Sequence, residues 1–160
     1  MQLNNLHILN VKKKIENLSK FLQSTNYFLN KKLISITSIK KISLNFHARF
    51  SAKQRIYTYI IFNRISRPSI EKNRGWHIKK KLDLKLMKKG AKKLLGTNDF
   101  STFRSSSCGA KSPIKTLKKV SIKKNKNKFI LKFTSKSFLQ QQVRSMVGCI
   151  KYLGEGKWSQ

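Results

Sequence analysis

Residues 55–63 read RIYTYIIFN, nine positions crowded with β-branched and aromatic side chains. This composition predicts a strand, because such side chains suit a pleated, half-buried surface. Two more strands are expected downstream, at about 116–123 and 129–134, joined into a hairpin by the polar stretch KNKNK. A further strand is expected upstream, from Leu33 to Ile42, where isoleucines alternate with Ser, Thr and Lys.

Apolar residues at helical spacing predict three helices around these strands. The first covers residues 12–30; the second opens at the N-cap Asp83 and closes at Gly96; the third runs from the N-cap Ser137 to Gly154. A basic loop that contains Gly75-Trp76-His77 is expected after Arg67-Pro68, and residues 97–113 are also expected to form a loop. The order predicts an α+β fold with mostly antiparallel neighbours, in a single domain over residues 1–160.

The charge of the chain points to a polyanionic partner. It has 37 Lys and Arg against 5 Asp and Glu, a net charge of +32, and nucleic acid would relieve the resulting self-repulsion. The abundance of Lys, Asn and Ile is also what an AT-rich genome produces without any selection for binding. The sequence has no apolar run long enough for a transmembrane helix and no secretory signal, so a cytoplasmic location is expected.

Residue patterns alone reveal no catalytic machinery. Asp83 fits a helix cap and Asp99 a turn, and no pair of carboxylates suits acid–base chemistry. Neither a Gly-rich phosphate loop nor metal-ligand spacing occurs, and Cys108 and Cys149 are expected to be reduced and structural. Composition and spacing therefore indicate a nucleic-acid binder.

Three segments carry a more specific signal. They read FHARFSA at 46–52, which leads into RIYTYIIFN, LLGTNDFSTFR at 94–104 and FLQQQVRSMVG at 138–148. In this order and spacing, and with Lys-Ser-Pro at 111–113, they resemble the bacterial tRNA pseudouridine synthase A family. The resemblance extends over about residues 33–154.

The resemblance implies an isomerase that converts uridine to pseudouridine in the tRNA anticodon stem-loop, without a cofactor and as a homodimer. It implies the pseudouridine synthase fold, an antiparallel sheet flanked by helices. The target base has to leave its stack, and an aromatic side chain to stack on it is then expected.

The resemblance also assigns roles to individual residues. On the family pattern Tyr57 is the stacking residue, and its hydroxyl is suited to remove the C5 proton; the alternative is an ordinary core aromatic of the strand. Arg144 falls on the basic active-site position that pairs with the catalytic aspartate; alternatively it contacts phosphate from a helix face. Arg49, Arg55 and Arg104 match basic positions expected to line the RNA path, with plain solvation as the alternative.

The departures from the family pattern concern catalysis. The nucleophilic Asp of the family lies in a Gly-Arg-Thr-Asp segment that these 160 residues lack, and Asp83 and Asp99 lie in other motifs. A Gly-Leu-Tyr-Leu strand, expected after Gln160, is also missing. The sequence therefore predicts an incomplete synthase domain, a fragment that binds tRNA without catalysis. The alternative is a non-catalytic basic RNA-binding protein, either a repurposed synthase relic or a ribosome-associated protein.

Overall fold

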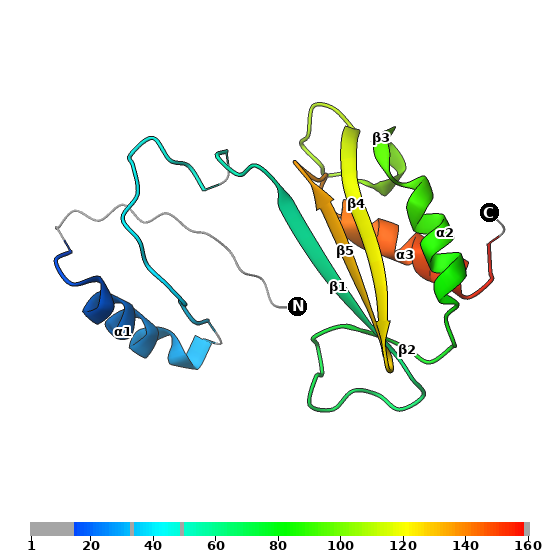
Figure 1. Cartoon of the computed structure of the whole chain (residues 1–160), viewed down its shortest axis with the longest axis horizontal. Helices are drawn as coiled ribbons and strands as arrows, with labels where there is room; N and C mark the ends of the chain where they lie inside the picture. Colours follow the sequence, from blue (N-terminus) through cyan, green and yellow to red (C-terminus); the bar gives the residue numbers. More distant parts are fainter. Residues whose placement is uncertain (1–14, 33, 49, 159–160) are drawn as a thin grey trace. The chain divides into compact units, whose positions relative to one another are not determined.

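The computed structural model describes residues 15–32, 34–48 and 50–158, which form two compact units divided between Ser51 and Ala52. The larger unit holds a five-stranded sheet and the helices α2 and α3, and the smaller unit holds the helix α1 (Figure 1). This content confirms an α+β fold. The single domain over residues 1–160 stays a prediction. None of the helices in the described ranges is long and apolar enough to cross a membrane.

Three long antiparallel strands form the centre of the sheet, whose order is β2-β1-β5-β4-β3. They are β1 (Arg55–Asn63), β4 (Ile114–Asn125) and β5 (Lys128–Ser135). The chain turns between β4 and β5 through two residues, of which Lys126 has a φ of +49°. The strand at 55–63 and the hairpin are therefore confirmed, with β4 and β5 somewhat longer than their patterns indicated.

Two short edge strands replace stretches that were predicted as loops. β2 (Trp76–Ile78) runs parallel to the end of β1, and β3 (Gly96–Asp99) pairs with the start of β4. Strands of three and four residues are too short for alternation to be visible, so their backbone partners define them. A Cβ atom on Gly75 would lie 2.7 Å from the carbonyl oxygen of Ile60, so the approach to β2 requires glycine.

The helix α2 (Leu84–Lys93) begins where its sequence predicts. Asp83 is the N-cap, and its Oδ1 accepts the backbone N–H groups of Lys85 at 2.6 Å and Leu86 at 3.1 Å. The prediction for its end is wrong, because Leu94 is the C-cap. Gly96 instead opens β3 with a φ of +93°, a conformation that glycine adopts without strain.

The helix α3 (Gln142–Gly154) ends as predicted but begins five residues after Ser137. Side chains hold the intervening residues in a turn. The Ser135 hydroxyl donates to the carbonyl of Ser137 at 2.7 Å, and Gln142 Oε1 accepts the N–H of Leu139 at 2.8 Å. Gln141, with a φ of +65°, separates this turn from the helix. Ser137 is therefore not the N-cap of α3.

The core lies between one face of the sheet and the helices α2 and α3. Alternation along β5 places Phe129, Leu131 and Phe133 on this face, each with no exposed surface. They belong to one buried cluster with Met87 of α2 and Met146 of α3. In Figure 1 the strands pass in front of α3, so the opposite, helix-free face of the sheet is turned toward the viewer.

The smaller unit contains α1 (Leu18–Leu29), inside the predicted range 12–30, followed by the 3-10 turn η1 (Asn30–Lys32). The strand predicted from Leu33 to Ile42 is wrong: residues 34–42 form no strand, and Leu33 lies outside the described residues. The Asn26 side chain donates to the carbonyl of Ile36 at 2.9 Å and accepts its N–H at 2.8 Å. A side chain therefore satisfies backbone groups that a strand would have paired in a ladder.

Candidate functional site

Tyr57 lies on the helix-bearing face of the sheet, near the start of β1. It is directly opposite Phe133 of β5 in the sheet register, so the two side chains share a face. Its ring meets the ring of Phe138 edge-on, with centroids 5.1 Å apart and planes at 83°. The side chain is 37% exposed. Tyr57 is thus held by packing at its edge while part of its surface stays open to a ligand.

Arg55 ties the start of β1 to the segment that carries Phe138. Its Nη1 donates to the carbonyl oxygen of Lys136 at 2.5 Å, just beyond the end of β5. A charged donor makes this bond stronger than a neutral one. Arg55 therefore positions the turn before α3, in addition to any contact with a ligand.

Arg144 is exposed in the first turn of α3, six residues after Phe138. The Gln141 side chain makes no capping hydrogen bond to the helix. The N-terminal end of a helix carries a partial positive charge, so Arg144 adds to a positive site there. This arrangement favours an anionic group, either a phosphate or a carboxylate.

A second loop meets the same turn from a distant part of the sequence. The N–H of Ser105 donates to the carbonyl of Gln140 at 3.0 Å, which places the exposed Arg104 beside the chain leading into α3. The 3-10 turn η2 (Ser101–Phe103) precedes Arg104 and is held by Asp99, whose carboxylate accepts the hydroxyl and N–H of Ser101. These bonds lower the pKa of Asp99, so its carboxylate is ionised. The same carboxylate is engaged by Ser101 as a local cap.

Comparison with known proteins gives this geometry its context. Residues 91–160 match the family model described as tRNA pseudouridine synthase. The tRNA pseudouridine synthase A of Pelagibacter ubique (strain HTCC1062) is 69% identical over 147 residues, which cover 92% of this chain and 60% of that protein. The proteins of the same name from Paramagnetospirillum magneticum and Caulobacter vibrioides (strain NA1000 / CB15N) are each 42% identical over 134 residues. These 134 residues are 84% of this chain, and 52% and 54% of those two proteins.

Over 92% of its length the chain is therefore similar to a tRNA pseudouridine synthase A, and its C-terminal part matches the synthase family model. It spans between about half and three fifths of the length of these curated relatives. Its five-stranded sheet with helices on one face is consistent with the pseudouridine synthase fold.

The structure brings together only some of the residues expected in a synthase site. Tyr57, Arg55 and the turn into α3 meet through the contacts of Phe138 and Lys136, and Arg104 reaches the same turn through Ser105. Arg49 lies outside the described residues. The roles of Phe138 and of the Gln140 carbonyl as links were not visible in the sequence, because turn-specific contacts leave no periodic pattern.

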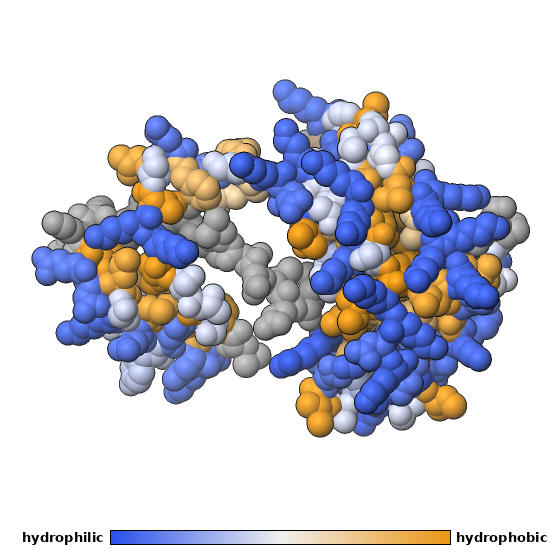
Figure 2. Space-filling view, in the orientation of Figure 1, coloured by the Kyte–Doolittle hydropathy of each residue, from blue (hydrophilic) through white to orange (hydrophobic). Residues whose placement is uncertain are grey.

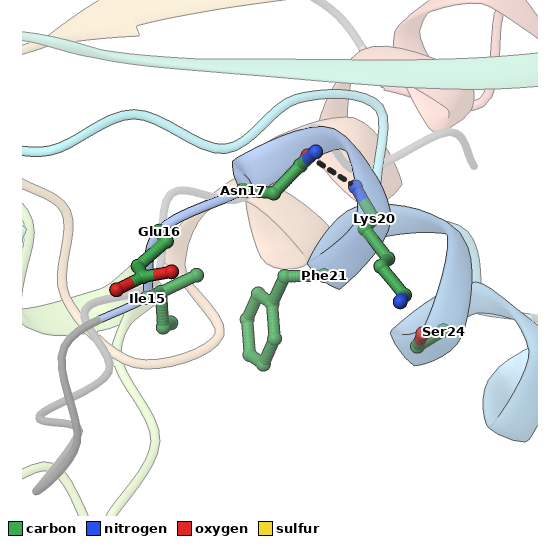
Figure 3. Close-up of a pocket in the computed structure, with 6 residues that line it drawn as sticks. All are labelled: Ile15, Glu16, Asn17, Lys20, Phe21 and Ser24. Carbon is green, nitrogen blue, oxygen red and sulfur yellow. Dashed lines mark hydrogen bonds between the residues drawn. The ribbon is translucent and has the colours of Figure 1, made fainter.

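Other parts of the chain bring fewer functional groups together. A hollow of about 580 Å³ lies at the start of α1, where Asn17 accepts the N–H of Lys20 at 2.9 Å (Figure 3). Its lining consists of one carboxylate, one amine, two other polar side chains and the apolar side chains of Ile15 and Phe21, a mixture that a helix end at the surface presents. Residues 15–32, 34–48 and 50–158 contain no group of three or more His, Cys, Asp and Glu side chains that could hold a metal ion.

The two thiols of the chain have opposite electrostatic environments. Backbone N–H groups of Ala110 and Gln140, together with the charge of Arg104, hold the pKa of Cys108 below its ordinary value. Burial raises the pKa of Cys149. At neutral pH, Cys108 therefore has the larger thiolate fraction.

This difference predicts selective alkylation. Iodoacetamide at neutral pH is expected to modify Cys108 several times faster than Cys149, because the thiolate is the reactive species. Peptide mass spectrometry over a time course measures both rates in one sample. Arg104→Gln should slow the reaction at Cys108 and leave Cys149 unchanged. Equal rates at the two thiols would contradict the assigned environments.

Proposed function

We propose that this chain is the part of a tRNA pseudouridine synthase that binds the anticodon stem-loop and presents Tyr57 and Arg144 to the target uridine. The observation that carries the proposal is the 69% identity to a protein named tRNA pseudouridine synthase A over 92% of this chain. The net charge of +32 supports it, since a polyanionic substrate relieves the repulsion among the lysines.

The proposed role of Tyr57 follows from its partly exposed ring. In the reaction, the bond between ribose and base moves from N1 to C5 of the uracil, and the proton on C5 has to leave. A ring braced at its edge by Phe138 keeps a fixed orientation, and bases stack well on such rings. The oxygen of the Tyr57 hydroxyl then takes the C5 proton while its own proton passes to solvent.

The arginines have proposed roles that differ with their surroundings. Arg144, at the positive end of α3, binds a phosphate of the flipped nucleotide and pairs with the catalytic aspartate that the family uses. Arg104 and Arg49 contact the RNA backbone. Arg55 orients the turn beside Tyr57 through Lys136, which makes it a positioning residue.

Catalysis requires one group that the 160 residues do not contain, the nucleophilic Asp of the Gly-Arg-Thr-Asp segment. We therefore propose that this chain binds tRNA but does not by itself form pseudouridine. The active species is proposed to be a cytoplasmic homodimer that needs no cofactor.

The experiment measures tritium release from tRNA labelled at C5 of uridine, together with tRNA binding. The chain alone is expected to bind tRNA without releasing tritium. A chimaera in which its matched 147 residues replace those of the Pelagibacter ubique protein is expected to release tritium. An inactive chimaera that folds and binds tRNA would contradict the synthase assignment, and release by the chain alone would contradict the need for the missing Asp.

The second candidate is a non-catalytic RNA-binding protein, favoured by the excess of 37 basic over 5 acidic residues. It predicts equal affinity for a tRNA anticodon stem-loop and an unrelated RNA hairpin, with a steep dependence on salt. A clear preference for the anticodon stem-loop at physiological salt would exclude it in favour of the synthase.

A further inference from the structure

The helix-free face of the sheet carries a hollow of about 490 Å³ across β1, β5 and β4. We propose that this hollow, called here the sheet groove, binds the phosphate backbone of a single RNA strand. The groove begins at Ile56, whose side chain points to the face opposite that of the adjacent Tyr57. It is therefore a second RNA-contacting surface, separate from the one in the proposed function.

Three lysines give the groove its charge. Lys119 and Lys123 are four residues apart on β4 and so share a face, and Lys132 of β5 lies opposite Ser121, midway between them. Diagonal neighbours of this kind are about 7–8 Å apart. All three side chains are exposed. The ion pairs among the described residues use Lys128, Lys151 and Lys157, none of which lines the groove.

The lining of the groove also includes apolar side chains and hydroxyl groups. Ile56, 58% exposed, lies opposite Thr134, Ile130 lies opposite Lys123, and Ser121 and Thr134 add polar contacts. Figure 2 views the molecule from this side and shows apolar patches interrupted by hydrophilic side chains over the sheet. A ribose–phosphate chain matches this pattern, because its sugars offer apolar surface and its 2′-hydroxyl groups bond to hydroxyls.

Charge decides between RNA and a second copy of this chain as the occupant. Two copies packed face to face would bring both sets of lysines together, and no carboxylate lines the groove to offset them. Like charges at an interface oppose association, whereas phosphates pair with each lysine. The observations therefore favour a polyanion.

The test replaces Lys119, Lys123 and Lys132 by Gln in the full chain. Fluorescence anisotropy with a labelled oligouridylate measures affinity over a range of salt concentrations. The loss of three phosphate contacts is expected to weaken binding by about tenfold or more at physiological salt, and to reduce the slope of log K against log salt by about 2. Because the probe forms no stem-loop, the result does not depend on any preference for the anticodon.

A matched variant removes the same charge from another surface. Lys85→Gln, Lys88→Gln and Lys92→Gln alter exposed residues of α2, and binding should change by about twofold at most. Equal weakening of RNA binding by both triple variants would overturn the proposal, since net charge alone would then explain the loss. Unchanged affinity in the groove variant, with sedimentation that shifts from dimer to monomer, would overturn it in favour of a second copy.

A measurement on the unaltered chain tests the same proposal without depending on whether the variants fold. Brief acetylation with and without oligouridylate, followed by mass spectrometry, reports the protection of each lysine. Lys119, Lys123 and Lys132 are expected to be protected more strongly than the lysines of α2. Uniform protection across both sets would overturn the proposal.

Discussion

Tyr57→Phe is expected to lower tritium release by the chimaera at least a hundredfold, while tRNA affinity changes by about twofold at most. The substitution keeps the ring and its edge-on contact with Phe138 and removes only the hydroxyl. General acid–base groups typically contribute about 10²–10⁴ in rate, so loss of the proton acceptor should act on the chemical step. Single-turnover assays with tRNA labelled at C5 give the rate, and filter binding gives the affinity.

Tyr59→Phe provides the matched control for this prediction. Tyr59 lies two residues further along β1 on the same face, where it packs against the buried cluster. Its hydroxyl has no proposed role in the reaction, so the rate should stay within about twofold of the parent. If Tyr57→Phe retained the parental rate, Tyr57 would be a stacking residue only, and another group would have to remove the C5 proton.

Phe133→Ala is expected to cost about 3–5 kcal/mol in the free energy of unfolding. Phe133 has no exposed surface and lies at the centre of the sheet, between Tyr57 of β1 and Val120 of β4. Truncation removes its buried apolar surface and leaves a cavity that the three paired strands cannot close. Urea unfolding followed by circular dichroism measures the loss, which is a large share of the stability of a typical domain.

Phe133→Leu distinguishes the effect of the cavity from the effect of losing the aromatic ring. Leucine refills most of the volume, so the expected cost is less than about 1.5 kcal/mol. Comparable losses for Ala and Leu would show that ring-specific contacts, rather than buried volume, stabilise this position. A loss below about 1 kcal/mol for Ala would contradict the burial of Phe133 in the core between the sheet and the helices α2 and α3.

Long elements with internal periodicity could be predicted from the sequence. β1 was predicted to the residue, because nine consecutive strand-forming side chains also pack in the sheet. β2 and β3 could not be found, since their pairing depends on distant backbone partners such as Ile61 opposite Trp76. The alternating stretch from Leu33 to Ile42 was misleading, because alternation produces a strand only where a ladder partner exists.

The candidate site was predictable only through the resemblance to a family. Tyr57 and Arg144 stand 87 positions apart in the sequence, and no local pattern links a strand tyrosine to a helix arginine. The links through Phe138 and the Gln140 carbonyl arise in turns, where hydrogen bonds to single backbone groups decide the geometry. Periodicity carries no information about such bonds.

The alternation of side chains along β1 has a consequence for how this strand tolerates mutation. A point substitution at Ile56 or at Tyr57 alters one side of the sheet only. An in-frame deletion of a single codon near the start of β1 would instead exchange the two sides, moving an isoleucine onto the helix-bearing side and a tyrosine onto the helix-free side. The length of this strand is therefore under stricter constraint than the identity of most of its residues.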